Sequence, residues 1–87
     1  MTLEFPNRSR SFDEARNAVR FIGHDGMFEV PFFVEAGALA KPAGTDLSET
    51  DCLNAFDAAR VAIHDVAREA YSHGRRTSYM LTAADFR

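Results

Sequence analysis

The chain has 87 residues, a formal net charge of −3 and a hydrophobic content of 46%, including eight Phe. A chain of this length predicts one domain, residues 1–87, because it is too short to build two hydrophobic cores. The hydrophobic content excludes a disordered chain, and the small negative charge gives no bulk-electrostatic sign of nucleic acid or of an anionic membrane.

Cysteine usage and hydropathy indicate the compartment. Cys52 is the only cysteine, which excludes an intrachain disulfide and a multi-cysteine metal site. The first ten residues contain no apolar run of signal-peptide length. No segment approaches the roughly 20 apolar residues of a membrane span. These observations predict a cytoplasmic protein without a membrane segment.

In chain order, residues 3–6 indicate an extended lead-in, because Pro6 biases the residue before it towards β geometry. Ser11 and Glu14 have the spacing of a helical capping box, which predicts a short helical turn.

Residues 18–34 predict a β-hairpin, because β-branched and aromatic residues alternate on both sides of the turn signal Gly23–Gly26. A two-residue or a four-residue loop places the same side chains on the face expected to pack on a helix: Val19, Phe21, Phe28, Val30 and Phe32. Four-residue closure also sets Arg20 opposite Glu29. In these registers the missing N–H of Pro31 falls where the ladder needs a donor. The second strand is therefore expected at a sheet edge, with pairing that stops or bulges near Pro31.

Residues 35–40 could form one or two helical turns, and Lys41 to Thr45 indicates a loop. The stretch 48–73 predicts one long amphipathic helix. One arc of this helix collects apolar residues: Cys52, Phe56, Ala59, Ile63, Val66, Ala67 and Ala70. Ser48 is placed to cap its first turn and Gly74 to end its last. Such a helix would be about 39 Å long, so one end is expected to overhang, fray or rest against a partner.

Residues 77–82 alternate again and predict a third strand, followed by a capping turn at Thr82–Asp85 that positions Phe86 against the fold. With the second strand at an edge, the third must pair with the first. The predicted fold class is therefore α+β, with a small antiparallel sheet of order 2-1-3 packed on one long amphipathic helix.

Several of these pieces match a known family nearly end to end. The matching residues are Phe5-Pro6-Asn7-Arg8-Ser9-Arg10 with Phe12-Asp13; Val19-Arg20-Phe21 with Gly23 and Asp25-Gly26; Val30-Pro31-Phe32-Phe33; Phe56-Asp57 with Arg60, Ile63 and Tyr71; and Tyr79-Met80-Leu81-Thr82-Ala83-Ala84-Asp85-Phe86. On these residues the chain resembles the bacterial family called domain of unknown function 1488. None of the matching motifs is a catalytic signature. The resemblance implies a small stand-alone bacterial protein with an α+β fold and no assigned activity.

One row on the predicted helix is the strongest candidate for a binding site. Arg60, His64 and Arg68 recur every four residues, so they stack on one helix face, with Asp57 one turn before and Tyr71 one turn after. Such a row could bind phosphates or the carboxylates of a partner. The alternative, which the sequence favours, is that the arginine stems cover hydrophobic surface and that Asp57 pairs with Arg60.

Other groups give weaker signals. A second set of arginines, Arg8, Arg10, Arg16 and Arg20 with Arg75 and Arg76, is interleaved with acidic residues and indicates a mixed solvated surface. His24, His64 and His73 lack metal-ligand spacing, and Cys52 indicates inert core. No serine has a paired base in the sequence, and no Gly-rich phosphate loop occurs. The sequence therefore predicts no catalytic residue, no metal and no cofactor.

The apolar arc from Cys52 to Ala70 steps by alternating fours and threes, which could seat a second helix as well as a sheet. A homodimer therefore stays open beside a monomer. The leading interpretation is a non-enzymatic cytoplasmic interaction or regulatory module with an unknown protein partner. The alternative is a nucleic-acid or anion-binding protein that uses Arg60, His64 and Arg68, and a small hydrolase ranks third.

Overall fold

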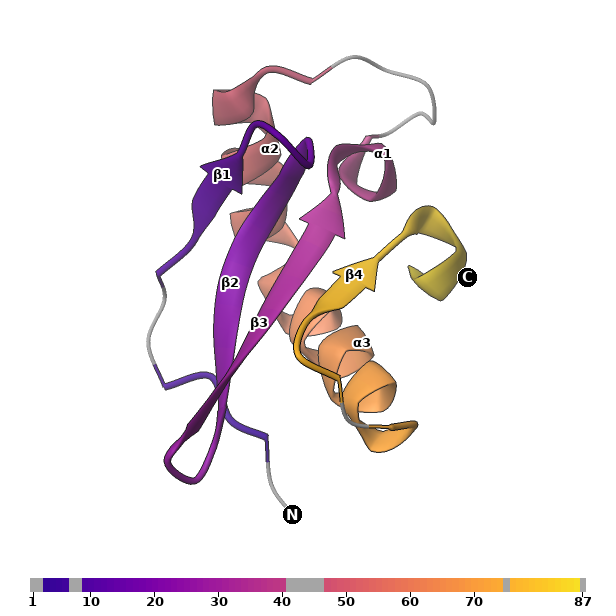
Figure 1. The fold of residues 1–87 in the computed structure, drawn as a ribbon. Helices are drawn as coiled ribbons and strands as arrows, with labels where there is room; N and C mark the ends of the chain where they lie inside the picture. The colour runs from indigo at the N-terminus through magenta and orange to yellow at the C-terminus, as the bar shows by residue number, and fades with distance from the viewer. Residues whose placement is uncertain (1–2, 7–8, 41–46, 75, 87) are drawn as a thin grey trace.

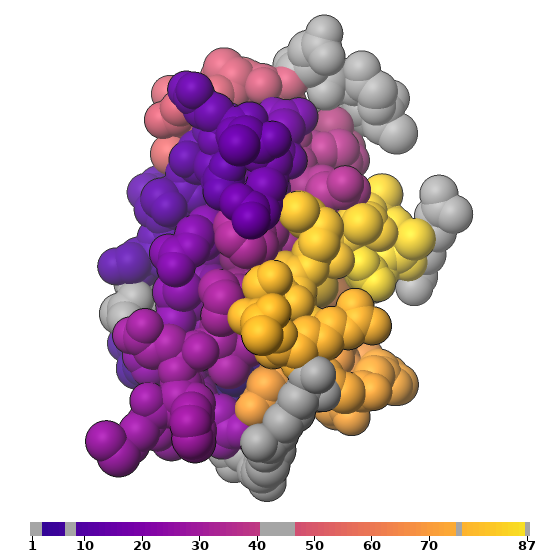
Figure 2. All heavy atoms as spheres, viewed as in Figure 1, coloured from indigo at the N-terminus to yellow at the C-terminus, as the bar shows by residue number. Residues whose placement is uncertain are grey.

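The computed structural model describes residues 3–6, 9–40, 47–74 and 76–86. Its elements are the strands β1 (Ser11–Asp13), β2 (Ala18–Asp25) and β3 (Phe28–Glu35), the helices α1 (Ala36–Leu39), α2 (Glu49–Ala58) and α3 (Arg60–Ser72), the strand β4 (Tyr79–Leu81) and the 3₁₀ helix η1 (Ala83–Phe86). The strands form one sheet of order β1-β2-β3-β4. Helices α2 and α3 pack behind this sheet in Figure 1, and the face towards the viewer is the one drawn as spheres in Figure 2. The α+β fold class is confirmed.

β2 and β3 form the predicted hairpin, but in a different register. Asp25 pairs with Phe28, so that Gly26 and Met27 alone make the turn. Gly26 has a φ of 62°, which suits the first central position of a type II′ turn. Arg20 consequently lies opposite Phe33 and not opposite Glu29.

The expected inward face of the hairpin is largely confirmed, since Val19, Phe21, Val30 and Phe32 are buried. Phe28 shares this face by alternation but is 72% exposed. It lies at the hairpin tip, which extends away from the helices in Figure 1.

Pro31 lies inside the ladder without interrupting it. The N–H and C=O of His24 both bond to Glu4, at N···O distances of 2.7 and 2.8 Å, on the edge of β2 away from β3. Every second residue of β2, Ile22 included, therefore directs its peptide groups away from β3. Pro31 pairs with Ile22 and so occupies a non-hydrogen-bonded position, where no N–H is needed. The predicted bulge and edge position are wrong, and β4 pairs with β3 from Phe32 onwards.

Two further predictions about strands are wrong. Ser11 begins β1 instead of a helical turn, and Asp13 accepts from the Arg16 N–H (3.1 Å) in the turn that leads to β2. β4 pairs with β3 and runs parallel to it, so the all-antiparallel order 2-1-3 is replaced. Parallel neighbours need a long crossover connection, and the helices α1, α2 and α3 between β3 and β4 provide one.

The predicted single helix over 48–73 is instead two helices, α2 and α3, which meet at Ala59 (φ −109°, ψ 15°) and point in different directions in Figure 1. A straight rod of about 39 Å would exceed the longest dimension of the molecule, 36 Å. The break lets both pieces follow the sheet. The predicted apolar arc still faces the core on both sides of the break, because Cys52, Phe56, Ile63 and Ala67 are all buried.

The predicted element ends are confirmed. Ser48 Oγ accepts from the Asp51 N–H (3.1 Å), and α3 ends before Gly74. Asp85 accepts from the Thr82 N–H (2.7 Å), and Phe86 packs against the core. Helix α1 lies within the predicted stretch 35–40, whereas the predicted loop 41–45 lies outside the described residues. The core between sheet and helices has as its largest fully buried side chains Phe32, Phe56, Ile63, Leu81, Val19, Val34 and Cys52.

Candidate functional site

The row of Arg60, His64 and Arg68 lies on α3, and two of its members hold the N-terminal segment. The His64 imidazole stacks on the Phe5 ring, with 3.9 Å between ring centres and 8° between planes. The Arg68 guanidinium carbon lies 5.2 Å from the centre of the Phe5 ring, and its Nε donates to the Leu3 carbonyl (3.2 Å). His64 and Arg68 therefore bind residues 3–5 against α3.

The first member of the row belongs to an ion-pair network. Asp57 accepts from Arg60 Nη2 (2.6 Å) and, through both carboxylate oxygens, from Arg10 Nε (3.1 Å) and Nη2 (2.8 Å). The Arg60 side chain is only 11% exposed, and its guanidinium lies over the Phe56 ring. The predicted Asp57–Arg60 pair is thus present. Arg10 was missed because it lies 47 residues away in the sequence.

Hydrogen bonds from Arg10 and then Arg60 lower the pKa of the Asp57 carboxyl below its ordinary value of 3.8. A carboxyl with a lowered folded-state pKa stabilises the fold above its ordinary pKa, and this stabilisation is lost as the pH falls through the folded-state value. We therefore expect Asp57→Asn to lower the urea midpoint at pH 7 and to reduce the further loss of stability between about pH 5 and pH 2. Asp65→Asn, at the exposed pair with Arg68, is the control. Equal pH dependence in Asp57→Asn and the unmodified protein would contradict this assignment.

The contacts of the row limit its chemistry. An anion at Arg60 would compete with Asp57, and one at Arg68 would compete with Asp65, which lies 3.3 Å from Arg68 Nη1. At the end of the row, Tyr71 donates its hydroxyl hydrogen to Asp25 (2.5 Å). Anion binding by this row stays a prediction.

Several of the remaining candidate residues are buried or contact neighbouring side chains in ways that serve the fold. Burial raises the pKa of the Cys52 thiol, which disfavours the reactive thiolate. His73 lies 3.0 Å from a Glu69 oxygen, and the Arg16 guanidinium lies over the Phe33 ring. Within residues 3–6, 9–40, 47–74 and 76–86, no three His, Cys, Asp or Glu side chains are placed to hold a metal ion. Arg8 and Arg75 lie outside the described residues.

A large apolar hollow on the surface, which we call the alanine groove, was not expected from the sequence. It has a volume of about 590 Å³ and is lined by Ala38, Leu39, Leu47, Ala55, Ala58, Ala59, Ala62, Ile63 and Phe86. Four of these alanines recur at helical spacing across the α2–α3 junction, and this was the available signal. All nine lining residues that the structure describes have apolar side chains.

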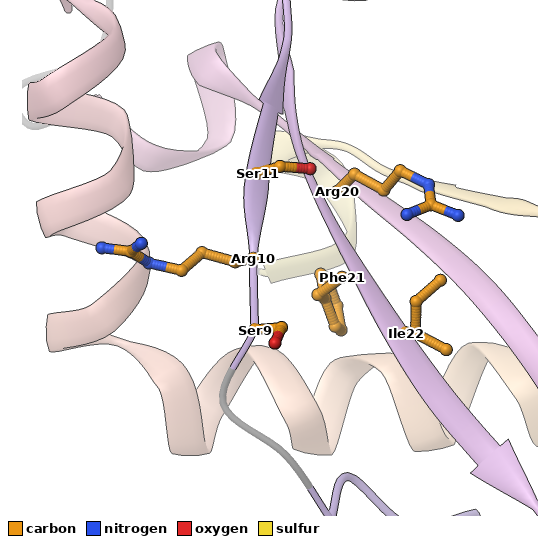
Figure 3. Close-up of a pocket in the computed structure, with 6 residues that line it drawn as sticks. All are labelled: Ser9, Arg10, Ser11, Arg20, Phe21 and Ile22. Atoms are coloured by element: carbon orange, nitrogen blue, oxygen red, sulfur yellow. The ribbon is translucent and has the colours of Figure 1, made fainter.

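Two smaller hollows are lined by both polar and apolar residues. One of about 290 Å³ lies beside the hairpin tip and is lined by Phe28, Glu29, Val30, Tyr71, Arg76 and Thr77. The other, of about 120 Å³, lies between β2 and the segment that enters β1 (Figure 3).

No helix in the described part of the chain is long and apolar enough to span a bilayer. Comparisons with curated proteins and with solved structures gave no match. Residues 3–82 match the family model described as "Protein of unknown function (DUF1488)". This match extends from the N-terminal segment through all four strands to the residue after β4, and the chain therefore belongs to the DUF1488 family.

Proposed function

We propose that this protein is a non-enzymatic interaction module that binds an amphipathic helix of a partner protein in the alanine groove. The apolar lining of the groove carries this proposal. The described residues of the lining can bury the apolar face of a partner, but none of them has a polar side chain to orient a polar substrate or to transfer a proton.

The shape of the groove favours a helix as the occupant. Ala55, Ala59 and Ala62 lack bulky side chains, so the backbone of a partner helix can approach α2 and α3 closely. Leu39 of α1 and Phe86 of η1 line the groove from other elements. A helix that presents apolar residues at positions i, i+3, i+4 and i+7 fits such a groove.

Charge on the alanine side of α2 and α3 favours a basic partner. Asp51 lies one turn before Ala55, and Asp65 lies one turn after Ala62, with Glu69 one turn further on. These acidic residues flank the apolar alanines, so basic residues beside the apolar face of the partner helix would complement them.

Two labelled synthetic peptides test this proposal, one of leucine and lysine and one of leucine and glutamate, each with all leucines on one helix face. We expect the leucine–lysine peptide to bind the purified protein in a fluorescence-anisotropy titration and the leucine–glutamate peptide to bind at least about tenfold more weakly. Ala62→Arg places a long cation in the groove and should weaken binding about tenfold or more. Val61→Arg adds the same charge at a neighbouring position that is 76% exposed and outside the groove lining, so it should change binding less than about twofold.

Three outcomes would contradict the proposal. Equal binding of both peptides, or equal effects of the two arginine variants, would exclude the groove as the binding site. A light-scattering mass of a dimer that Ala62→Arg converts to a monomer would show that a second copy occupies the groove. Salt-dependent retention on heparin that Arg60→Ala with Arg68→Ala abolishes would support the arginine row instead.

A further inference from the structure

Among the described residues, none pairs with the outer edge of β2 at Ile22. On the side away from β3, β1 covers Ala18–Arg20 and Glu4 covers His24, which leaves Ile22 between them. Because the peptide groups of His24 point to this side, those of Ile22 point there too. No described residue bonds to the Ile22 N–H or C=O. A hydrogen-bond donor and an acceptor therefore face the same gap.

A hollow of about 120 Å³ occupies this gap and is lined by Ser9, Arg10, Ser11, Arg20, Phe21 and Ile22. In Figure 3, Ser9, Arg10 and Ser11 follow one another along one wall, and β2 forms the other. A serine hydroxyl is both a donor and an acceptor, and none of the described lining residues carries a carboxylate. Its volume suits a small polar group such as a phosphate.

Two arginines, Arg10 and Arg20, line the hollow, and they differ in their partners. Arg10 is paired with Asp57, so its charge is already matched by a carboxylate. Arg20 is exposed and has no acidic partner among the described residues. Its guanidinium points away from Arg10 in Figure 3, so a change of rotamer is needed to bring it to a ligand in the hollow. The positive charge of Arg20 is thus available to an anion at the hollow.

From this arrangement we infer that the hollow binds a phosphate group that still carries a proton, either inorganic phosphate or a phosphate monoester. The Ile22 N–H and the Arg20 guanidinium donate to the charged oxygens, and the Ile22 carbonyl accepts the hydrogen of the P–OH group. Sulfate and phosphate diesters carry no such hydrogen at neutral pH. Either would place an oxygen acceptor against the Ile22 carbonyl, which costs binding energy.

The test is a titration of the ¹⁵N-labelled protein at about pH 6, where monoester phosphates are partly protonated, and at constant ionic strength. The ligands are sodium phosphate, phenyl phosphate, sodium sulfate and dimethyl phosphate. We expect the Ile22 amide resonance to shift saturably with phosphate or phenyl phosphate, and sulfate and dimethyl phosphate to bind at least about tenfold more weakly. Tighter binding of phenyl phosphate than of phosphate would identify a phosphorylated molecule as the ligand, and the reverse order would identify the free ion.

Arg20→Gln should weaken phosphate binding about tenfold or more, because it removes a charge-assisted hydrogen bond. Arg16→Gln is the matched control, since Arg16 lies over Phe33 and pairs with Asp13, outside the lining of the hollow. Equal affinity for phosphate and sulfate would reduce the site to a general cationic patch and overturn the inference. Slow hydrogen exchange of the Ile22 amide in the ligand-free protein would overturn its premise, because that amide would then already have a partner.

Discussion

Phe56→Ala is expected to lower the free energy of unfolding by about 3–5 kcal/mol and the melting temperature by at least about 12 °C. Phe56 is fully buried on α2, where its ring centre lies 5.0 Å from that of Phe21 on β2. Truncation leaves a cavity between helix and sheet and removes the ring beneath the Arg60 guanidinium. Thermal and urea unfolding followed by circular dichroism measure the effect.

Val61→Ala is the control for this variant, because the Val61 side chain on α3 is 76% exposed and lies outside the core. It should change the free energy of unfolding by less than about 0.5 kcal/mol. A melting temperature unchanged by Phe56→Ala would mean that the contact between α2 and the sheet contributes little to stability, in conflict with the complete burial of the Phe56 ring.

Gly23→Ala is expected to displace the N-terminal segment and to cost about 1–3 kcal/mol. A Cβ atom at residue 23 would lie 2.9 Å from Leu3 Cδ1, 3.0 Å from Phe5 Cε1 and 3.1 Å from Phe32 Cε1. Phe32 is fixed in the core, so the segment that carries Leu3 and Phe5 must move. Loss of hydrogen-exchange protection at the Glu4 amide, which donates to the His24 carbonyl, reports this displacement directly.

A double-mutant cycle separates this effect from general strain in β2. If Gly23→Ala acts by displacing the N-terminal segment, then its cost should shrink in a Phe5→Ala background, because the stacking of Phe5 on His64 is already lost there. Fully additive costs would show that the alanine strains the strand itself and leaves the segment in place.

Most elements could be located from signals between residues close in the sequence, whereas the strand order depends on which strands pair. The Ser48 cap and the Thr82–Asp85 turn each depend on residues three apart, and both are confirmed. The predicted strand order was wrong because it depended on a single inference, namely that Pro31 places the second strand at a sheet edge. Moving the turn to Gly26–Met27 places Pro31 in a non-hydrogen-bonded pair, so the second strand need not lie at an edge. No pattern within the hairpin distinguishes these registers, since both leave the same side chains on the inner face.

The break at Ala59 had no local signal, because neither Pro nor Gly occurs there and the apolar periodicity continues across it. It reflects the fit of the helices to the sheet. The candidate site likewise depends on tertiary contacts that the sequence pattern does not reveal. Helical spacing found Arg60, His64 and Arg68 and the Asp57 pair, whereas Arg10 and the Phe5 ring reach this row through tertiary contacts. The alanine groove is formed by separate elements and emerges only when they pack.

The parallel pairing of β4 with β3 has a consequence for synthesis on the ribosome. Phe32, Phe33 and Val34 pair with Tyr79–Leu81, which are translated only after the helices α1, α2 and α3 that separate β3 from β4. Until those residues emerge, one side of β3 remains an unpaired hydrophobic strand, the kind of surface through which nascent chains aggregate. Prematurely terminated chains would keep that edge permanently, and they should depend on chaperones or be degraded.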